Sequence, residues 1–177
     1  MTGYACPCGY YTDPKKTCRC HPNQIAKYMG KISGPLLDRI DIHIDIPAVK
    51  YKELTEAKDA EPSAAIKERV HKARAIQLER FSTKMLGGSA TICGKKEDRI
   101  YFNAQMNTKL IKRYCVLSVE AKELLKMAMN EMGLSARAYD KILRVSRTVA
   151  DLTGSGSIEA PHISEAIQYR SLDRQIF

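Results

Sequence analysis

Apolar residues in the second half of the chain recur every three or four positions, which is the spacing of one face of an α-helix. The pattern predicts four helices, at residues 107–114, 118–133, 135–154 and 162–170. The first three start at residues that commonly cap helix N-termini, namely Asn107, Ser118 and Ser135. Glycines close the second and third helices, as expected where a helix ends in a left-handed residue. These segments predict a small helical bundle and a fold class that is mostly α.

A longer helix is predicted from a Ser63 N-cap and Ala64 to about Lys84. One side of it carries Ile66, Val70, Ala73, Gln77 and Phe81. The other faces are basic, with Lys67, Arg69, His71, Lys72, Arg74 and Arg80. A solvated surface is the simpler interpretation of such a face, and contact with nucleic acid is the alternative. Residues 86–99 have no clear period and are expected to form a flexible loop.

The first half of the chain predicts shorter elements. Residues 22–32 carry apolar positions at helical spacing, with Pro22 suited to the first turn. Residues 41–46 alternate polar and apolar, which predicts a half-buried strand with its isoleucines inward and His43 on the polar face. Residues 51–62 are charged and poor in large apolar groups, so a linker is predicted there.

Four of the six cysteines form a dense motif, C-x-C-x9-C-x-C, made of Cys6, Cys8, Cys18 and Cys20. In a reducing compartment this density favours a metal over disulfides, because four thiolates can close a tetrahedral Zn²⁺ site. Such a site would be structural, since four sulfurs leave no open position for catalysis. Free thiols in a turn, or an incidental disulfide, are the alternatives. His21 could replace one ligand, although as the neighbour of Cys20 it is more simply a bystander.

The charge balance adds a preference for anionic partners. Lys and Arg outnumber Asp and Glu by 29 to 20, which gives a net charge of +9. A nucleotide, a nucleic acid or an acidic protein surface would all suit this charge. We expect neither a membrane span nor a secretory signal, because there is no run of about eighteen apolar residues and no basic segment leading into an apolar one. The cytoplasm is therefore the expected location.

Arg39 stands at the junction between a short helical turn and the predicted strand. Asp38 and Asp41 bracket it, so an ordinary surface ion pair is one interpretation. The other is that the rigid junction presents the planar guanidinium to a phosphate, for example on a neighbouring subunit.

Arg137 lies in the first turn of the predicted third bundle helix, where the helix dipole disfavours a cation by up to ~1 kcal/mol. With Lys141 and Arg144 it forms a basic stripe. A solvated face is the simpler interpretation, with Arg144 and Arg147 in exposed ion pairs with Asp140 and Asp151 that contribute little. The alternative is that Arg137 reaches an anion held between the bundle and another domain.

Several motifs stand in a familiar order. Residues 34–41, Gly-Pro-Leu-Leu-Asp-Arg-Ile-Asp, resemble the arginine-finger segment of magnesium chelatase and related AAA+ ATPases. Residues 134–139, Leu-Ser-Ala-Arg-Ala-Tyr, resemble the sensor-2 helix in the lid of the same class. Cys-Pro-Cys-Gly-Tyr at 6–10 precedes them, and Ala-Asp-Leu at 150–152 and Glu-Ala-Ile-Gln-Tyr-Arg at 165–170 follow. Over nearly its whole length the chain resembles the bacterial magnesium chelatase-like family of the YifB/ComM type.

The resemblance implies an ATPase that binds ATP with Mg²⁺, works as a homo-oligomeric ring, expected to be a hexamer, and acts on DNA in recombination during natural transformation. Arg39 would be the catalytic arginine finger on the neighbouring subunit's nucleotide, and Arg137 the lid residue that binds the nucleotide of its own subunit. The family's Walker A and Walker B motifs do not occur in the 177 residues. The resemblance therefore implies a C-terminal part that is inactive as an ATPase by itself.

The expected organisation follows from the same resemblance. Residues 1–50 would be the end of an AAA+ α/β core with a four-cysteine insertion, residues 51–62 the linker, and residues 63–177 the helical lid. A zinc-stabilised basic module that binds nucleic acid or protein, without nucleotide chemistry, is the rival hypothesis. A magnesium chelatase partner acting on a tetrapyrrole is a weaker third, because no His or carboxylate cluster in the sequence supports it.

Overall fold

The computed structural model describes residues 6–11, 13, 15–44, 46, 60–82 and 100–170. The chain divides into two compact units, an N-terminal unit of Met1–Ala60 with Arg170–Phe177 and a helical unit of Glu61–Tyr169. The predicted loop at 86–99 and most of the predicted linker at 51–62 lie outside the described residues. Within those residues the fold is mostly helical, as predicted.

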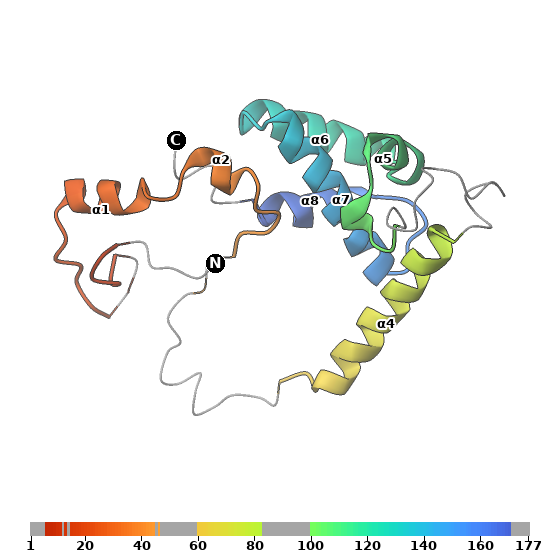
Figure 1. The fold of residues 1–177 in the computed structure, drawn as a ribbon, viewed down its shortest axis with the longest axis horizontal. Coiled ribbons are helices and arrows are strands. Elements are labelled where there is room, and N and C mark those ends of the chain that lie inside the picture. The colour runs from red at the N-terminus through yellow and green to blue at the C-terminus, as the bar shows by residue number, and fades with distance from the viewer. Residues whose placement is uncertain are drawn as a thin grey trace. The chain divides into compact units, whose positions relative to one another are not determined.

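The helical unit is a bundle (Figure 1). Its helices are α4 (Ser63–Arg80), α5 (Thr108–Tyr114), α6 (Val119–Glu131), α7 (Ala136–Leu152) and α8 (Ala160–Gln168), with a 3₁₀ turn η2 (Asn103–Gln105) before α5. The predicted N-caps of α5, α6 and α7 are confirmed. The side chains of Asn107, Ser118 and Ser135 each accept a hydrogen bond from a backbone N–H three residues later, at 3.0, 3.2 and 3.1 Å. Contacts within one turn therefore determine where these helices begin.

Helix α7 is the centre of the bundle, since α4, η2, α5 and α8 all pack against it. Its Ile142 and Leu143 are buried together with Leu125 of α6 and Ile163 of α8. A parallel bridge between Leu117 and Ile158 ties the segment before α6 to the segment before α8. The core is therefore built from apolar positions that repeat at helical spacing, which is the pattern that predicted it.

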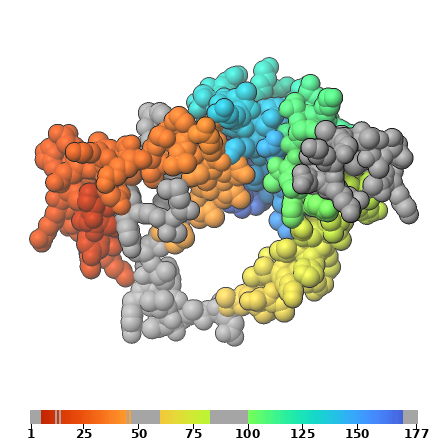
Figure 2. All heavy atoms as spheres, in the orientation of Figure 1, coloured from red at the N-terminus to blue at the C-terminus, as the bar shows by residue number. Residues whose placement is uncertain are grey.

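Helix α4 joins the bundle only through its C-terminal part. Ala73, Gln77 and Phe81 are buried, whereas Ile66 and Val70 are 41% and 44% exposed. The side that carries these five residues is thus buried only in the second half of the helix. Figure 1 shows α4 meeting the bundle at its C-terminal end, and on the face shown in Figure 2 its first half (yellow) stands clear of the other helices of its unit.

The start of α4 also differs from the prediction. Its N-cap is Pro62, which offers no side-chain hydrogen bond, and Ser63 is the first helical residue. Helix α4 therefore begins without the side-chain capping that α5, α6 and α7 have.

The N-terminal unit contains α1 (Pro22–Met29) and the four-residue turn α2 (Gly34–Leu37). Both follow the prediction, with a proline in the first turn of each. His21 is not part of the four-cysteine cluster, as predicted. It is the N-cap of α1, where its Nδ1 accepts from the Asn23 N–H at 3.4 Å and its own N–H donates to the Gln24 side chain at 3.0 Å.

The predicted strand at 41–46 is wrong for the residues that the structure describes there, 41–44 and 46. Its isoleucines point to solvent, with Ile42, Ile44 and Ile46 46%, 66% and 82% exposed, and His43 is buried at 5%. Inside and outside are thus the reverse of the prediction. A strand needs a neighbouring strand for its backbone hydrogen bonds, and the described residues provide none at this segment.

None of the described helices combines the length and the apolar character that a membrane crossing requires.

Candidate functional site

The four N-terminal cysteines come together as predicted. The Sγ atoms of Cys6, Cys8, Cys18 and Cys20 all lie within 4.8 Å of one another. Three of the separations are 3.3 Å for Cys6–Cys8, 3.7 Å for Cys6–Cys18 and 3.6 Å for Cys8–Cys18. A tetrahedral zinc with Zn–S bonds of ~2.3 Å requires sulfurs about 3.8 Å apart. The cluster thus has the donor atoms and nearly the spacing of a four-thiolate site.

The local backbone explains how the first two cysteines share one side. Residues 6–9 form a tight turn, closed by a hydrogen bond from the Gly9 N–H to the Cys6 carbonyl at 3.1 Å. Gly9 has φ +81°, a conformation that other residues adopt at a cost, so the turn depends on glycine here. The turn places the sulfurs of Cys6 and Cys8 close to the sulfur of Cys18.

The thiols of the cluster affect one another's ionisation. A hydrogen bond from the Tyr10 backbone, with a further one from Cys6, lowers the pKa of Cys8 to about 6. At Cys18 the backbone of Cys20 lowers the pKa, but burial and the thiols of Cys8 and Cys6 outweigh it and raise the pKa to about 12. Of these two thiols, Cys8 therefore ionises more readily. A bound divalent cation would favour the thiolate form of its ligands.

Arg39 lies just after α2, in the turn that its sequence predicted. Leu37 is buried beneath the turn, while Arg39 is exposed and donates a long hydrogen bond, 3.4 Å, to the Pro35 carbonyl. Its backbone N–H bonds the Leu36 carbonyl at 3.0 Å. The ring of Pro35 fixes the backbone at the start of α2. The chain therefore presents a guanidinium at the surface from a backbone held by local hydrogen bonds.

Asp38 does not simply form a surface pair with Arg39. Its carboxylate lies 3.9 Å from the guanidinium of Arg170, a residue far along the chain that is 1% exposed. Arg170 also donates a hydrogen bond of 2.9 Å to the Ile40 carbonyl. Sequence reasoning missed this contact, because the partners are 130 residues apart.

Arg137 is exposed in the first turn of α7, as predicted. Its helix begins with the Ser135 cap and has no acidic residue in its first turn. The N-terminal end of α7 is therefore electropositive through both its dipole and its side chain, which suits an anion. Arg39 belongs to the N-terminal unit and Arg137 to the helical unit.

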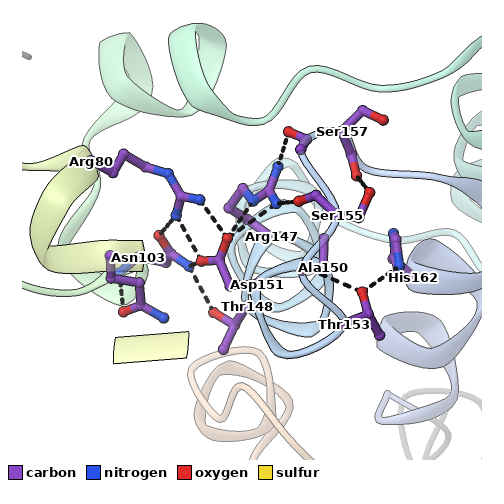
Figure 3. A network of polar contacts seen from close by, with 12 residues as sticks. Arg80, Asn103, Arg147, Thr148, Ala150, Asp151, Thr153, Ser155, Ser157 and His162 are labelled. Carbon is purple, nitrogen blue, oxygen red and sulfur yellow. Dashed lines mark hydrogen bonds and ion pairs between the residues drawn. The ribbon is translucent and has the colours of Figure 1, made fainter. Parts of the chain in front are cut away.

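The helical unit holds a buried polar network that the sequence did not reveal (Figure 3). Its centre is Asp151, whose side chain is 0% exposed. The carboxylate accepts from Arg80 at 2.7 Å and from Asn103 at 2.7 Å, and from the Nε of Arg147 at 3.1 Å. A second Arg80 nitrogen also contacts it. The network joins α4, η2 and α7, so the exposed Arg147–Asp151 pair that was predicted is wrong.

Arg147 carries the network one step further. Its terminal nitrogens donate to the Ser155 carbonyl at 2.5 Å and the Gly156 carbonyl at 2.9 Å, in the turn after α7. Burial lowers the pKa of Arg147, and the neighbouring Asp151 opposes this. One signal was present in the sequence, because the uncharged residues Leu143, Ser146 and Ala150 form a second stripe beside Arg147, and all three are buried. The network links three elements of the helical unit through buried side chains, which is a structural role.

Comparison with known proteins identifies the family to which the chain belongs. A family model described as "Magnesium chelatase, subunit ChlI C-terminal" matches residues 60–170, and one described as "Magnesium chelatase, subunit ChlI" matches residues 1–54. The chain is 40% identical over 169 residues to the competence protein ComM of Haemophilus influenzae. It is 34% and 32% identical over 169 residues to the YifB proteins of Salmonella typhimurium and Escherichia coli.

Each of these alignments takes in 95% of this chain but 29% of the relative's length. The residues matched by the two family models contain the cysteine cluster, the Arg39 turn and the Arg137 helix described above. The chain belongs to the magnesium chelatase ChlI-like family, and within it to the group of ComM and YifB.

Proposed function

We propose that this chain is the C-terminal part of a ring-forming AAA+ ATPase, in which Arg39 acts on the nucleotide of a neighbouring subunit and Arg137 contacts the nucleotide of its own. The observation that carries the proposal is the Arg39 turn. An exposed guanidinium follows a buried Leu37 in a backbone held by hydrogen bonds, so it can reach outward without being loose. In phosphoryl transfer such an arginine stabilises charge that develops in the transition state.

Arg137 fits the second role through its place on α7. It adds a cation to a helix N-terminus, where a phosphate is the favourable partner and a cation alone is not. The nucleotide would bind as ATP with Mg²⁺, and the ring would be a homo-oligomer, which we propose to be a hexamer. By similarity to the competence protein ComM we propose DNA as the substrate, and the cytoplasm as the location where ATP and reduced thiols coexist.

We also propose that the four cysteines bind a structural zinc ion. The ion would cross-link the turn at residues 6–9 to the segment before α1, in a unit where few described apolar residues are buried. It takes no part in nucleotide chemistry, because all four positions are filled by sulfur.

The test of the ATPase role uses the full-length protein with Arg39→Ala. We expect hydrolysis to fall by on the order of 10³-fold or more while ATP binding is retained. Lys27→Ala, which removes an exposed cation from α1 of the same unit, is the control and should turn over normally. Normal turnover of Arg39→Ala would contradict the proposal.

A mixing experiment tests whether Arg39 acts between subunits. Arg39→Ala subunits and subunits with a disabled P-loop are each inactive, but a mixture should regain part of the activity. The intact Arg39 of one subunit then serves the intact nucleotide site of the other. No recovery in rings shown to be mixed would place Arg39 in its own subunit's site. The 177-residue chain alone, which has no Walker A motif, is the background control.

The rival basic module has less support from the structure. On α4, Arg69 is held by Glu61 through hydrogen bonds of 2.9 and 3.1 Å, and Arg74 stacks over the ring of Phe102 at 3.8 Å. Cations that already have protein partners would have to exchange them for phosphates. Strongly salt-dependent DNA binding by this chain, lost when α4 cations are removed, would favour the module after all.

A further inference from the structure

One buried arginine holds both neighbours of Arg39. The guanidinium of Arg170 donates to the Ile40 carbonyl at 2.9 Å and lies 3.9 Å from the Asp38 carboxylate. Asp38 and Ile40 are the residues immediately before and after Arg39 in the chain. A single side chain therefore spans the turn from which Arg39 projects.

The turn needs such an anchor because its own structure is short. Helix α2 has four residues, and its N-cap Ser33 makes no side-chain capping bond. Only Leu37 of this helix is buried. The turn after it has the local hydrogen bonds from the N–H groups of Arg39 and Ile40, at 3.0 and 2.9 Å. One helical turn with a single buried side chain is marginal by itself.

Arg170 is suited to the task by its chemistry and its burial. Its side chain is 1% exposed, so its hydrogen bond to the Ile40 carbonyl competes little with water. A guanidinium presents several donors in a fixed plane, which lets one group address a carbonyl and a carboxylate together. Lysine keeps the charge but offers a single nitrogen and no plane. The two residues are therefore not equivalent at this position.

We propose that Arg170 is the positioning residue for Arg39: it fixes the backbone on both sides of Arg39 and so sets the direction in which that guanidinium points. This inference rests on the proposed role of Arg39 as an arginine finger. Arg170 itself stays buried and touches no nucleotide. Its effect on catalysis passes entirely through Arg39.

The first experiment measures the turn directly, without any ATPase activity. Amide hydrogen exchange, read by mass spectrometry on this chain, is compared for wild type, Arg170→Gln and Arg170→Lys. In Arg170→Gln the amides of Arg39 and Ile40 should exchange roughly 10- to 100-fold faster, because a hydrogen bond to a charged group is lost. Arg170→Lys should be intermediate. Peptides from α7 should exchange as in wild type, which shows that the helical unit stays folded.

The second experiment measures turnover in the full-length protein. Arg170→Gln should lower kcat by roughly 10- to 100-fold, the effect of a misplaced catalytic group, with little change in the KM for ATP. Arg170→Lys should recover part of the loss. The double variant Arg39→Ala, Arg170→Gln should be no slower than Arg39→Ala alone, since the two act as one unit.

The outcomes separate the inference from the function on which it rests. Unchanged exchange at the Arg39 turn in Arg170→Gln overturns the anchor. A double variant clearly slower than Arg39→Ala overturns the route through Arg39. Normal hydrolysis by Arg39→Ala overturns the finger itself, and the exchange data then still decide whether Arg170 holds the turn.

Discussion

Replacing Asp151 by asparagine removes one negative charge from the centre of the helical unit without changing the size of the side chain. Asp151 accepts hydrogen bonds from Arg80, Arg147 and Asn103 inside the protein. The side chains of Arg80 and Arg147 are 13% and 2% exposed. With an amide in place of the carboxylate, two guanidiniums would remain buried without a counter-charge, and the amide nitrogen would add donors to a site already full of them.

The size of the effect follows from that arrangement. Removing one partner of a buried ion pair destabilises a protein by about 3–5 kcal/mol, because the remaining charge stays desolvated. For a domain of this size, each kcal/mol lowers the melting temperature by roughly 4 °C. We therefore expect Asp151→Asn to melt roughly 10–20 °C below wild type. Arg80→Met should cost less, since Arg147 still neutralises Asp151.

Thermal unfolding followed by far-ultraviolet circular dichroism measures this, because most described helix lies in the helical unit. The matched control is Glu68→Gln, which breaks the ion pair with Lys72 on the open face of α4. Both of its side chains are mostly exposed, at 74% and 68%, so the melting temperature should be that of wild type. If Asp151→Asn had the same melting temperature as Glu68→Gln, the network would contribute no more to stability than a surface ion pair, and the reasoning would be refuted.

Three further predictions concern single groups. Burial raises the pKa of Cys115 from 9.0 to about 11, so its neutral thiol contributes stability that is fully present below pH 9 and is lost toward pH 11. In urea unfolding over this pH window, wild type should therefore lose stability relative to Cys115→Val. The same dependence of unfolding free energy on pH in both proteins would contradict this prediction. Gly133 has φ +58°, so Gly133→Ala should cost about 1–2 kcal/mol, whereas Gly156→Ala, open and not left-handed, should be neutral in the same assay. Native mass spectrometry should find a zinc ion bound to the purified chain, and chelation should make the four N-terminal thiols, but not Cys115, reactive; little zinc with all four already reactive would refute the site.

The elements that could be predicted from the sequence are those whose causes are local. Ser118 and Ser135 cap their helices through a backbone N–H three residues away, so the signal and the structure lie within one helical turn. The cysteine cluster could be predicted in the same way, because its four cysteines lie close together in the sequence and their sulfurs meet in the structure. Residue type and spacing carry enough information in such cases.

The features that could not be predicted from the sequence depend on contacts outside the local segment. Arg80 and Asp151 are 71 residues apart, and an Arg147–Asp151 pair at i, i+4 looks the same in sequence whether it is exposed or buried. The segment at 41–46 has the alternation of a strand, but alternation cannot reveal whether a neighbouring strand is present. For α4, the apolar side continues past the point where the bundle ends, so Ile66 and Val70 are exposed.

The way α4 is docked has a mechanical consequence. The helix has 18 residues and is therefore about 27 Å long, yet only its last turns are fastened, by Ala73, Gln77, Arg80 and Phe81. The helix could therefore pivot about its C-terminal turns, because its first half is not packed against the bundle. Tilting it about its C-terminal end by about 10° would carry the Ser63 end through roughly 5 Å, from the helix length alone. A displacement of that end would be transmitted along the helix to its C-terminal turn, where Arg80 contacts Asp151.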